Sequence, residues 1–161
     1  MSLQHEMGYR HPLENLEQEA LLNVMYTALV FSKEGYRLLS PLRLTESQFN
    51  VLMILKYQSG GEPMTQTRLG NMLLVNRSNV TGLIDRMEKA GWVERMNDAA
   101  DRRINRVRLT KAGVHRLAEA EPVYFARLKD VIGVLNRKEQ KQLCRLLERI
   151  RTTLPATNGD T

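Results

Sequence analysis

The apolar residues in the central third of the chain change their spacing from helical to alternating. Residues 66–74 and 77–90 carry the spacing of two short helices joined by a tight connection. Gly91 can end the second helix, and apolar residues then alternate with polar ones in 92–96 and again in 104–109. Two short helices followed by a hairpin predict a winged helix-turn-helix.

The residues before this segment predict two further helices. Apolar residues recur at helical spacing over 13–39, and Pro41 ends that helix. Thr45 and Gln48 form a capping-box pattern that opens a helix over 46–58. A long helix and a medium one therefore precede the winged segment.

Two long helices are expected after the winged segment. Thr110 caps a helix over 111–133, and Pro122 inside it predicts a kink. A last helix covers 137–154, with its apolar residues on one stripe. The fold class that follows is mainly α with a small β-hairpin wing, a winged helix-turn-helix plus a helical dimerisation region.

The long helices carry more apolar surface than a winged domain of about 65 residues can cover, so a second copy must cover it. We therefore expect a homodimer. The expected boundaries are a helical dimerisation region at 13–44 and 111–154, a winged helix-turn-helix DNA-binding domain at 45–110, and flexible termini at 1–12 and 155–161.

The charge is concentrated in the winged segment. The chain carries a net charge of +6, and residues 65–111 alone hold ten Lys and Arg against five Asp and Glu, a net +5. Such a cluster suits a partner with phosphates. No apolar run long enough to span a membrane and no secretory core occurs, and the single Cys144 fits a reducing compartment, so we expect a cytoplasmic protein without a membrane partner.

The helix over 77–90 has one apolar and one polar side. Its apolar side holds Val80, Leu83, Ile84 and Met87. Its polar side holds Ser78, Gly82, Asp85 and Lys89, flanked by Arg77, Asn79, Thr81 and Arg86. Short polar side chains suit entry into the major groove of DNA, although such a face is also the ordinary solvated side of an amphipathic helix.

The hairpin tip supplies a second group of candidate DNA contacts. Arg102 and Arg103 can reach the minor groove or its phosphates, although a charged turn can also serve solubility alone. Asp85 would be repelled by phosphates unless a cation neutralises it. We therefore expect Asp85 to pair with Arg103 and to hold the wing against the helix.

Residues 64–113 closely resemble the DNA-binding core of the MarR family of regulators. The resemblance is carried by the helix phrase NVTGLIDRMEKAGWVER, the wing phrase DAADRR and the closing phrase RLTKAG. With the flanking helices it covers about residues 13–154. It implies a triangular homodimer in which the first and the last two helices of each copy interlock.

The resemblance also implies roles for individual residues. DNA contacts would come from Gln66, Arg77, Ser78, Asn79, Thr81, Arg86, Arg102 and Arg103, with Arg86 holding phosphate or bracing the wing and Arg102 entering the minor groove. Asp101 and Arg103 match the Asp-x-Arg wing pattern of the family, and Asp101 joins Asp85 as a wing-organising residue. Ala100 stands where many members carry another basic residue.

Members of this family commonly respond to a small aromatic or phenolic effector, and repression is their usual action. The side chains that could line an effector crevice are Met25, Tyr26, Phe31, Tyr36 and Phe49, which suit a plain core equally well. The ligand-binding residues are therefore left unassigned. We interpret Cys144 as a buried structural residue, and the scattered His5, His11 and His115 predict no metal site. No cofactor is expected.

The resemblance predicts a repressor that binds a pseudo-palindromic operator in double-stranded DNA. A winged helix that binds only proteins is the first alternative, and the clustered positive charge argues against it. An enzyme is the second alternative. It lacks support because the sequence has no Gly-rich phosphate loop and no nucleophile and base constellation.

Overall fold

The computed structural model describes residues 2–73, 77–97 and 105–155. In chain order the elements are α1 (Leu3–Glu6), α2 (Leu16–Leu39), the 3-10 helix η1 (Ser40–Leu42), α3 (Glu46–Tyr57), β1 (Met64–Thr65), α4 (Gln66–Leu73), α5 (Arg77–Lys89), β2 (Val93–Asn97), β3 (Asn105–Leu109), α6 (Lys111–Ile132) and α7 (Arg137–Arg151). The predicted mainly helical fold with a small β wing is confirmed. The turn of helix α1 was not predicted.

Side-chain caps fix where the helices begin. The Thr45 hydroxyl accepts the Gln48 backbone N–H at 3.2 Å, and the Gln48 side chain accepts the Thr45 N–H at 2.9 Å, so the predicted capping box is present. Thr110 caps α6 through the Gly113 N–H. Asn15 caps α2, which therefore begins at Leu16, three residues later than expected.

The sheet has three antiparallel strands in the order β1-β3-β2. The wing strands β2 and β3 pair from Val93 opposite Leu109 to Asn97 opposite Asn105. The short β1, which the sequence did not predict, places Met64 opposite Val107. This pairing ties the start of α4 to the wing.

The core of the chain lies inside the winged part. Its buried side chains are Leu39, Leu44, Phe49, Val51, Leu52, Leu55, Met64, Leu69, Val80, Leu83, Ile84, Met87, Val93, Val107, Leu117 and Ala120. They come from the end of α2, the segment that joins α2 to α3, α3, α4, α5, the strands and the first half of α6. No described residue of α7 is buried in the single chain.

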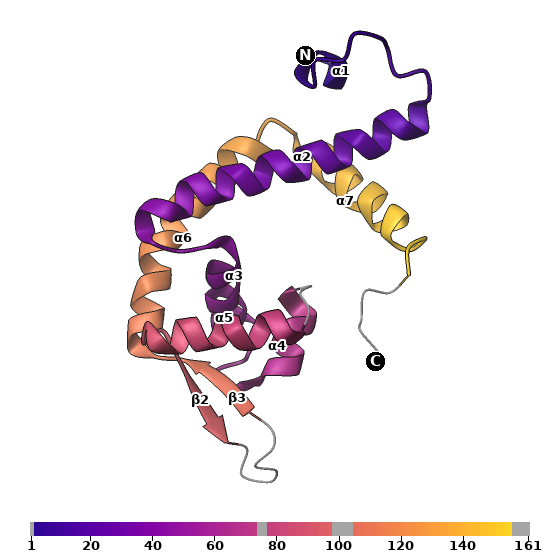
Figure 1. Ribbon diagram of the computed structural model, residues 1–161. Coiled ribbons are helices and arrows are strands. Elements are labelled where there is room, and N and C mark those ends of the chain that lie inside the picture. Colours follow the sequence, from indigo (N-terminus) through magenta and orange to yellow (C-terminus); the bar gives the residue numbers. More distant parts are fainter. Residues whose placement is uncertain (1, 74–76, 98–104, 156–161) are drawn as a thin grey trace.

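The long helices lie apart from this core. Figure 1 shows α2, the later part of α6 and α7 along one side of the molecule, and α3, α4, α5 and the strands on the other. Helix α6 continues through Pro122. It changes direction partway along its length, as the predicted kink requires (Figure 1). Among the described residues, none of the helices combines the length and the apolar character needed to span a membrane.

Candidate nucleic-acid interface

Helix α5 separates its apolar and polar residues as the sequence predicted. Val80, Leu83, Ile84 and Met87 are each at most 5% exposed and join the core. On the other side Asn79, Thr81, Arg86 and Lys89 are exposed. The helix therefore presents a polar surface to solvent while its apolar side holds it in place.

The predicted DNA-contact residues fall into three groups. Asn79, Thr81 and Arg86 are exposed side chains of α5, and Arg77 and Ser78 are the first two residues of that helix. Gln66 is the half-buried first residue of α4. The predictions for Asp101, Arg102 and Arg103 lie outside the described residues.

Arg95 joins the wing to α5. Its Nη2 donates to Asp85 Oδ1 at 2.5 Å and its Nη1 donates to Glu88 Oε2 at 2.5 Å. Its backbone N–H donates to Glu88 Oε1 at 3.0 Å, and Nη2 also approaches the Thr81 carbonyl oxygen at 3.4 Å. One side chain of β2 thus holds three residues of α5.

The pKa of Arg95 is affected by its burial and by the two acids at this junction. Partial burial alone would lower the pKa of Arg95, but hydrogen bonds and charge from Asp85 and Glu88 outweigh burial and raise that pKa above its ordinary value. The pairing expected for Asp85 was with Arg103, which lies outside the described residues. Neither Arg95 nor Glu88 was predicted to take part in this junction, although the spacing of Asp85 and Glu88 places both acids on one helix face.

The base of the wing packs closely on the start of α6. The Thr110 hydroxyl donates to the Gly91 carbonyl oxygen at 2.6 Å. Gly91 has a φ of +74°, as predicted for the residue that closes α5. A Cβ on Gly113 would lie 2.0 Å from the Trp92 carbonyl oxygen, so only glycine fits there. These contacts fix the wing base relative to α6.

Gly82 lies in the middle of α5 with free space around it. A Cβ there would meet only the end of the Arg86 side chain, whose Nη1 would lie 3.5 Å away, an ordinary contact. Glycine in a helix interior lowers helix stability relative to alanine. Nothing within the described part of the chain requires glycine at this position.

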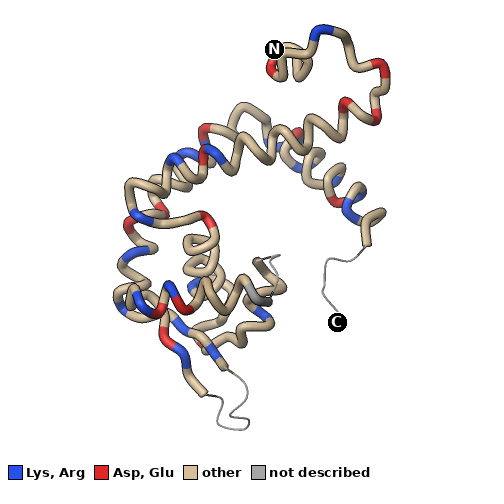
Figure 2. The backbone as a smooth tube through the Cα atoms, viewed as in Figure 1, with Lys and Arg blue, Asp and Glu red and all other residues tan. Residues whose placement is uncertain are grey.

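The described wing strands carry one acid, Glu94, and three arginines, Arg95, Arg106 and Arg108. Arg108 Nε donates to Glu94 Oε1 at 2.6 Å across the two strands, and both side chains are nearly half exposed. Figure 2 shows Lys and Arg on the strands and again along α7, with acidic residues between them. The predicted cluster of positive charge thus includes the arginines of the two wing strands.

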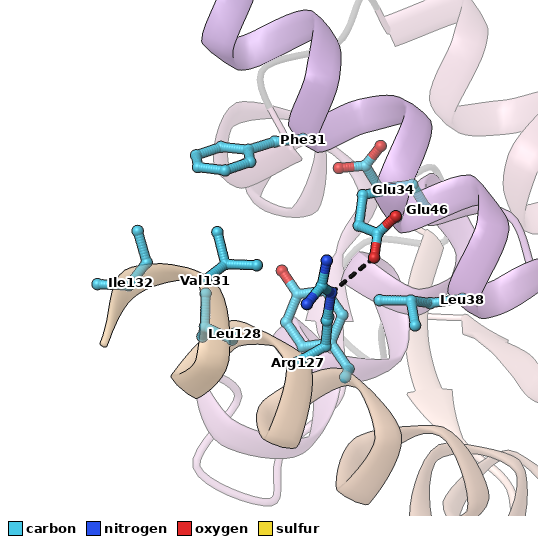
Figure 3. Close-up of a pocket in the computed structure, with 10 residues that line it drawn as sticks. Phe31, Glu34, Leu38, Glu46, Arg127, Leu128, Val131 and Ile132 are labelled. Carbon is cyan, nitrogen blue, oxygen red and sulfur yellow. Dashed lines mark hydrogen bonds and ion pairs between the residues drawn. The ribbon is translucent and has the colours of Figure 1, made fainter. Parts of the chain in front are cut away.

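A pocket of about 120 Å³ lies between α2, the start of α3 and α6 (Figure 3). Its lining residues are Phe31, Glu34, Gly35, Leu38, Glu46, Tyr124, Arg127, Leu128, Val131 and Ile132. Of the five side chains that the sequence offered for an effector crevice, Phe31 alone belongs to this lining. Phe49 is a core residue whose ring centroid lies 4.6 Å from that of Tyr124.

Glu34 holds two arginines at one end of the pocket. Arg37 binds its carboxylate with two hydrogen bonds of 2.9 Å, and Arg127 Nε donates to Oε1 at 2.6 Å. Hydrogen bonds from Arg37 first and Arg127 second lower the pKa of Glu34 from its ordinary 4.5 to about 2. Glu34 is therefore ionised at neutral pH, and it links α2 to α6.

The expectation for Cys144 was wrong. Cys144 is exposed in the single chain, because it lies beside the apolar stripe of α7 and no other described helix covers it. Within the described part of the chain, no group of three or more His, Cys, Asp or Glu residues could hold a metal ion.

The sequence of the winged part is similar to those of known regulators of transcription. The sequence model of the MarR family matches residues 44–104. The transcriptional activatory protein BadR of Rhodopseudomonas palustris is 39% identical over 107 residues, 66% of this chain and 61% of its own length. An uncharacterized HTH-type transcriptional regulator of Bacillus cereus is 32% identical over 109 residues, 66% of this chain and 69% of that protein.

Solved structures agree with the fold. AbsC of Streptomyces coelicolor, a MarR family transcriptional regulator, superimposes with a TM-score of 0.81 at 25% identity over 89% of this chain and 97% of that one. The transcriptional repressor CouR, bound to a 23-mer DNA duplex, has a TM-score of 0.71 at 28% identity, covering 88% of this chain and 99% of that one.

The fold and the interface define a winged-helix regulator of transcription that binds DNA. The chain belongs to the MarR family, as its sequence motifs indicated. AbsC, CouR and BadR are all described as regulators of transcription, in line with the expectation that this protein is not an enzyme.

Proposed function

We propose that this protein is a homodimeric repressor that binds a pseudo-palindromic operator and releases it when a small effector binds. The observation that carries the proposal is the division of α5, whose apolar side is buried in the core while Asn79, Thr81 and Arg86 are exposed. A helix held in this way can enter the major groove without disturbing its own domain.

The residues proposed to contact DNA differ in what they can recognise. Asn79 can pair with adenine in bidentate fashion, Thr81 can donate to or accept from base edges, and Arg86 can bind guanine or phosphate. Arg77 and Ser78 at the start of α5 and Gln66 at the start of α4 complete the major-groove set. Arg102 and Arg103 are proposed to reach the minor groove, and Asp85 and Asp101 to organise the wing.

Exposed apolar side chains support the proposed homodimer. Those of the single chain include Leu21, Val24, Met25, Leu29 and Val30 in α2, Val123, Phe125 and Leu128 in α6, and Leu143, Leu146 and Ile150 in α7. Surfaces of this kind in a monomer mark sites of association. With 13–44 and 111–154 as the dimerisation region, two-fold symmetry would place the two α5 helices about 34–36 Å apart, one turn of DNA.

An effector would act by shifting populations. A ligand releases DNA only if it binds more tightly to a dimer whose two α5 helices are wrongly spaced. The pocket between α2, α3 and α6 is the proposed site, because Glu46 belongs to the winged part while Glu34 and Arg127 belong to the long helices. A ligand there would contact both parts, and a small aromatic or phenolic compound fits its size and walls.

Repression is proposed over activation from family resemblance, and CouR is described as a repressor. BadR is described as an activatory protein, so the two outcomes need a direct test. A reporter gene under the native promoter distinguishes repression from activation. Deletion of this regulator should raise reporter expression if it represses and lower expression if it activates.

The test of DNA binding is a selection of genomic fragments by the purified protein at about 150 mM salt, followed by footprinting of the recovered sites. The proposal expects one shared palindrome whose two halves are protected together. Recovery of unrelated fragments with equal affinity would contradict it.

A further inference from the structure

Helix α7 is strongly basic, although it is not part of the winged segment. It holds six Lys and Arg against two Asp and Glu, a net +4. The helix lies with the long helices, apart from α5 and the wing strands (Figure 1), and Lys and Arg recur along its length (Figure 2). The proposed operator contacts all lie in the winged part, so they give this charge no role.

Four of the cations share one side of α7. At 100° per residue, Lys138, Lys141, Arg145 and Arg149 fall within about 80° of one another around the helix. We call these four residues the α7 basic stripe. All four are exposed, and Lys138, Arg145 and Arg149 line one hollow of the helix surface. The stripe is therefore one continuous positive surface.

The stripe has no acidic partner within the described part of the chain. Arg145 Nε donates to the Lys141 carbonyl oxygen at 3.3 Å, a contact inside the helix. Of the two acids of α7, Glu139 belongs to the capping box, where its Oε2 accepts the Asn136 N–H at 2.7 Å. Glu148 lies beside the stripe, and with this acid counted the four cations still leave a net +3. An anionic partner is needed to balance that charge.

The proposed homodimer would leave the stripe uncovered. The exposed apolar side chains Leu143 and Ile150 lie on the far side of the helix from Arg145 at 100° per residue. A second copy that covers the apolar side does not reach the stripe, because burial of unpaired cations would be costly. The stripe is thus open to a partner in the single chain and in the proposed dimer.

The composition and spacing of the stripe favour a phosphate backbone over a protein. Protein interfaces are centred on apolar or aromatic anchors and are depleted in Lys, whereas the stripe consists of Lys and Arg alone. From Lys138 to Arg149 the helix rises about 16 Å. One strand of a DNA duplex places about five phosphates over this length. A regulator held on its operator is surrounded by further DNA, so duplex DNA is the phosphate partner within reach.

From these observations we infer that the α7 basic stripe binds the phosphates of a second DNA duplex while α5 holds the operator. One dimer would then bridge two stretches of DNA. The second contact would not depend on base sequence, because Lys and Arg at phosphates carry no sequence information directly. The inference goes beyond the proposed function, which uses one duplex and the winged part only.

The test uses the full-length protein saturated with its selected operator, to which a labelled duplex of unrelated sequence is added. Fluorescence anisotropy gives the affinity for the labelled duplex, and analytical ultracentrifugation gives the number of duplexes per dimer. The wild-type complex should bind the labelled duplex without releasing the operator. Its affinity should fall about 100-fold between about 50 and 200 mM salt, as about four phosphate contacts require.

The stripe variant combines Lys138→Gln, Arg145→Gln and Arg149→Gln. Its affinity for the second duplex should fall at least about tenfold at about 50 mM salt, and the salt slope should decrease by about three, one for each cation removed. Operator affinity should stay unchanged. Glutamine is a good helix former, and the apolar side of α7 is untouched, so the variant should fold and dimerise. Arg145→Gln alone, with a slope lower by about one, keeps the test available if the triple variant does not fold.

The control variant combines Arg10→Gln, Lys33→Gln and Lys129→Gln. It removes the same charge from exposed positions outside the stripe and outside the winged part. Binding of the second duplex should be unchanged in this variant, because the contact depends on the stripe and not on net charge. An equal loss in the control and stripe variants would overturn the inference.

Other outcomes would also overturn it. One duplex per dimer at saturation would refute the second contact and leave operator binding intact. Loss of operator affinity in the stripe variant would place the stripe on the same duplex as α5. Polyglutamate and phosphatidylglycerol vesicles are the rival probes, and stripe-dependent binding to either that is tighter than binding to the duplex would assign the surface to an acidic protein or a lipid.

Discussion

Arg95 of β2 and Asp85 of α5 form an ion pair of 2.5 Å that ties the first wing strand to the helix with the exposed polar face. Glu88, one helical turn further on, binds the same guanidinium at 2.5 Å. Because both acids belong to α5, the direction of the wing is set relative to that helix. A protein that places a helix and a hairpin in adjacent grooves of DNA needs this relationship to be fixed.

Replacing Arg95 with methionine should weaken operator binding about tenfold, or about 1.4 kcal/mol, because the wing loses its anchor. The cost in unfolding free energy should stay below about 2 kcal/mol, since exposed ion pairs contribute at most about 1 kcal/mol each. Fluorescence anisotropy and urea denaturation measure the two quantities. Glu94→Gln, which breaks a pair within the sheet only, is the control, and an equal loss of affinity in that variant would contradict the anchoring role.

Gly82→Ala should separate stability from DNA binding. The added methyl group meets only the end of the Arg86 side chain, so the unfolding free energy should rise by about 0.5–1 kcal/mol. Operator affinity should fall if the polar side of α5 contacts DNA as proposed, because the methyl group would occupy space on that side. Thermal unfolding and anisotropy on the same sample give both results, and unchanged operator affinity would show that Gly82 has no role in approach to DNA.

Gly113→Ala should destabilise the fold, in contrast to Gly82→Ala. A Cβ at this position would lie 2.0 Å from the Trp92 carbonyl oxygen, a backbone atom that cannot move alone. The substitution should lower the unfolding free energy by roughly 3 kcal/mol or more, as overpacking against fixed neighbours does. Urea denaturation monitored by the fluorescence of Trp92, the sole tryptophan, measures it. A loss below about 0.5 kcal/mol would mean that α6 and the wing base are not held together as described.

The ion pairs of Glu34 predict a pH dependence. The folded-state pKa of about 2 lies below the ordinary 4.5, so this stabilising contribution is fully present above pH 4.5 and is lost as the pH falls through about 2. Carbon-13 NMR should find the Glu34 carboxylate still ionised at about pH 3, and Arg127→Met should raise the midpoint. A midpoint near 4.5 in the wild-type protein would contradict the ion pairs.

Local patterns were enough to predict most of the fold. The sequence predicted the caps at Thr45 and Thr110, the buried side of α5 and the glycine that ends this helix. Each of these features depends on residues within one or two helical turns. The strand β1 was missed because its partner Val107 lies 43 residues away from Met64. A two-residue strand leaves no periodicity to detect.

The polar face of α5 was predictable from the sequence, but the contacts between α5 and the wing were not. Alternation in β2 indicates which residues share a face of the sheet, but not that Arg95 would meet Asp85 and Glu88 on another element. Cys144 was misassigned for a related reason. An apolar neighbourhood in sequence implies burial only when another element covers that helix face, and in the single chain none of the described ones does.

Binding by a pair of α5 helices is tested directly by the affinity of the protein for three duplexes: its selected palindrome, one isolated half-site, and a palindrome with five base pairs inserted at its centre. Paired α5 helices spaced by one turn of DNA predict tight binding to the palindrome and a loss of at least about 100-fold for the other two duplexes, because half a turn moves one half-site to the far side. Equal affinity for all three duplexes would contradict the account.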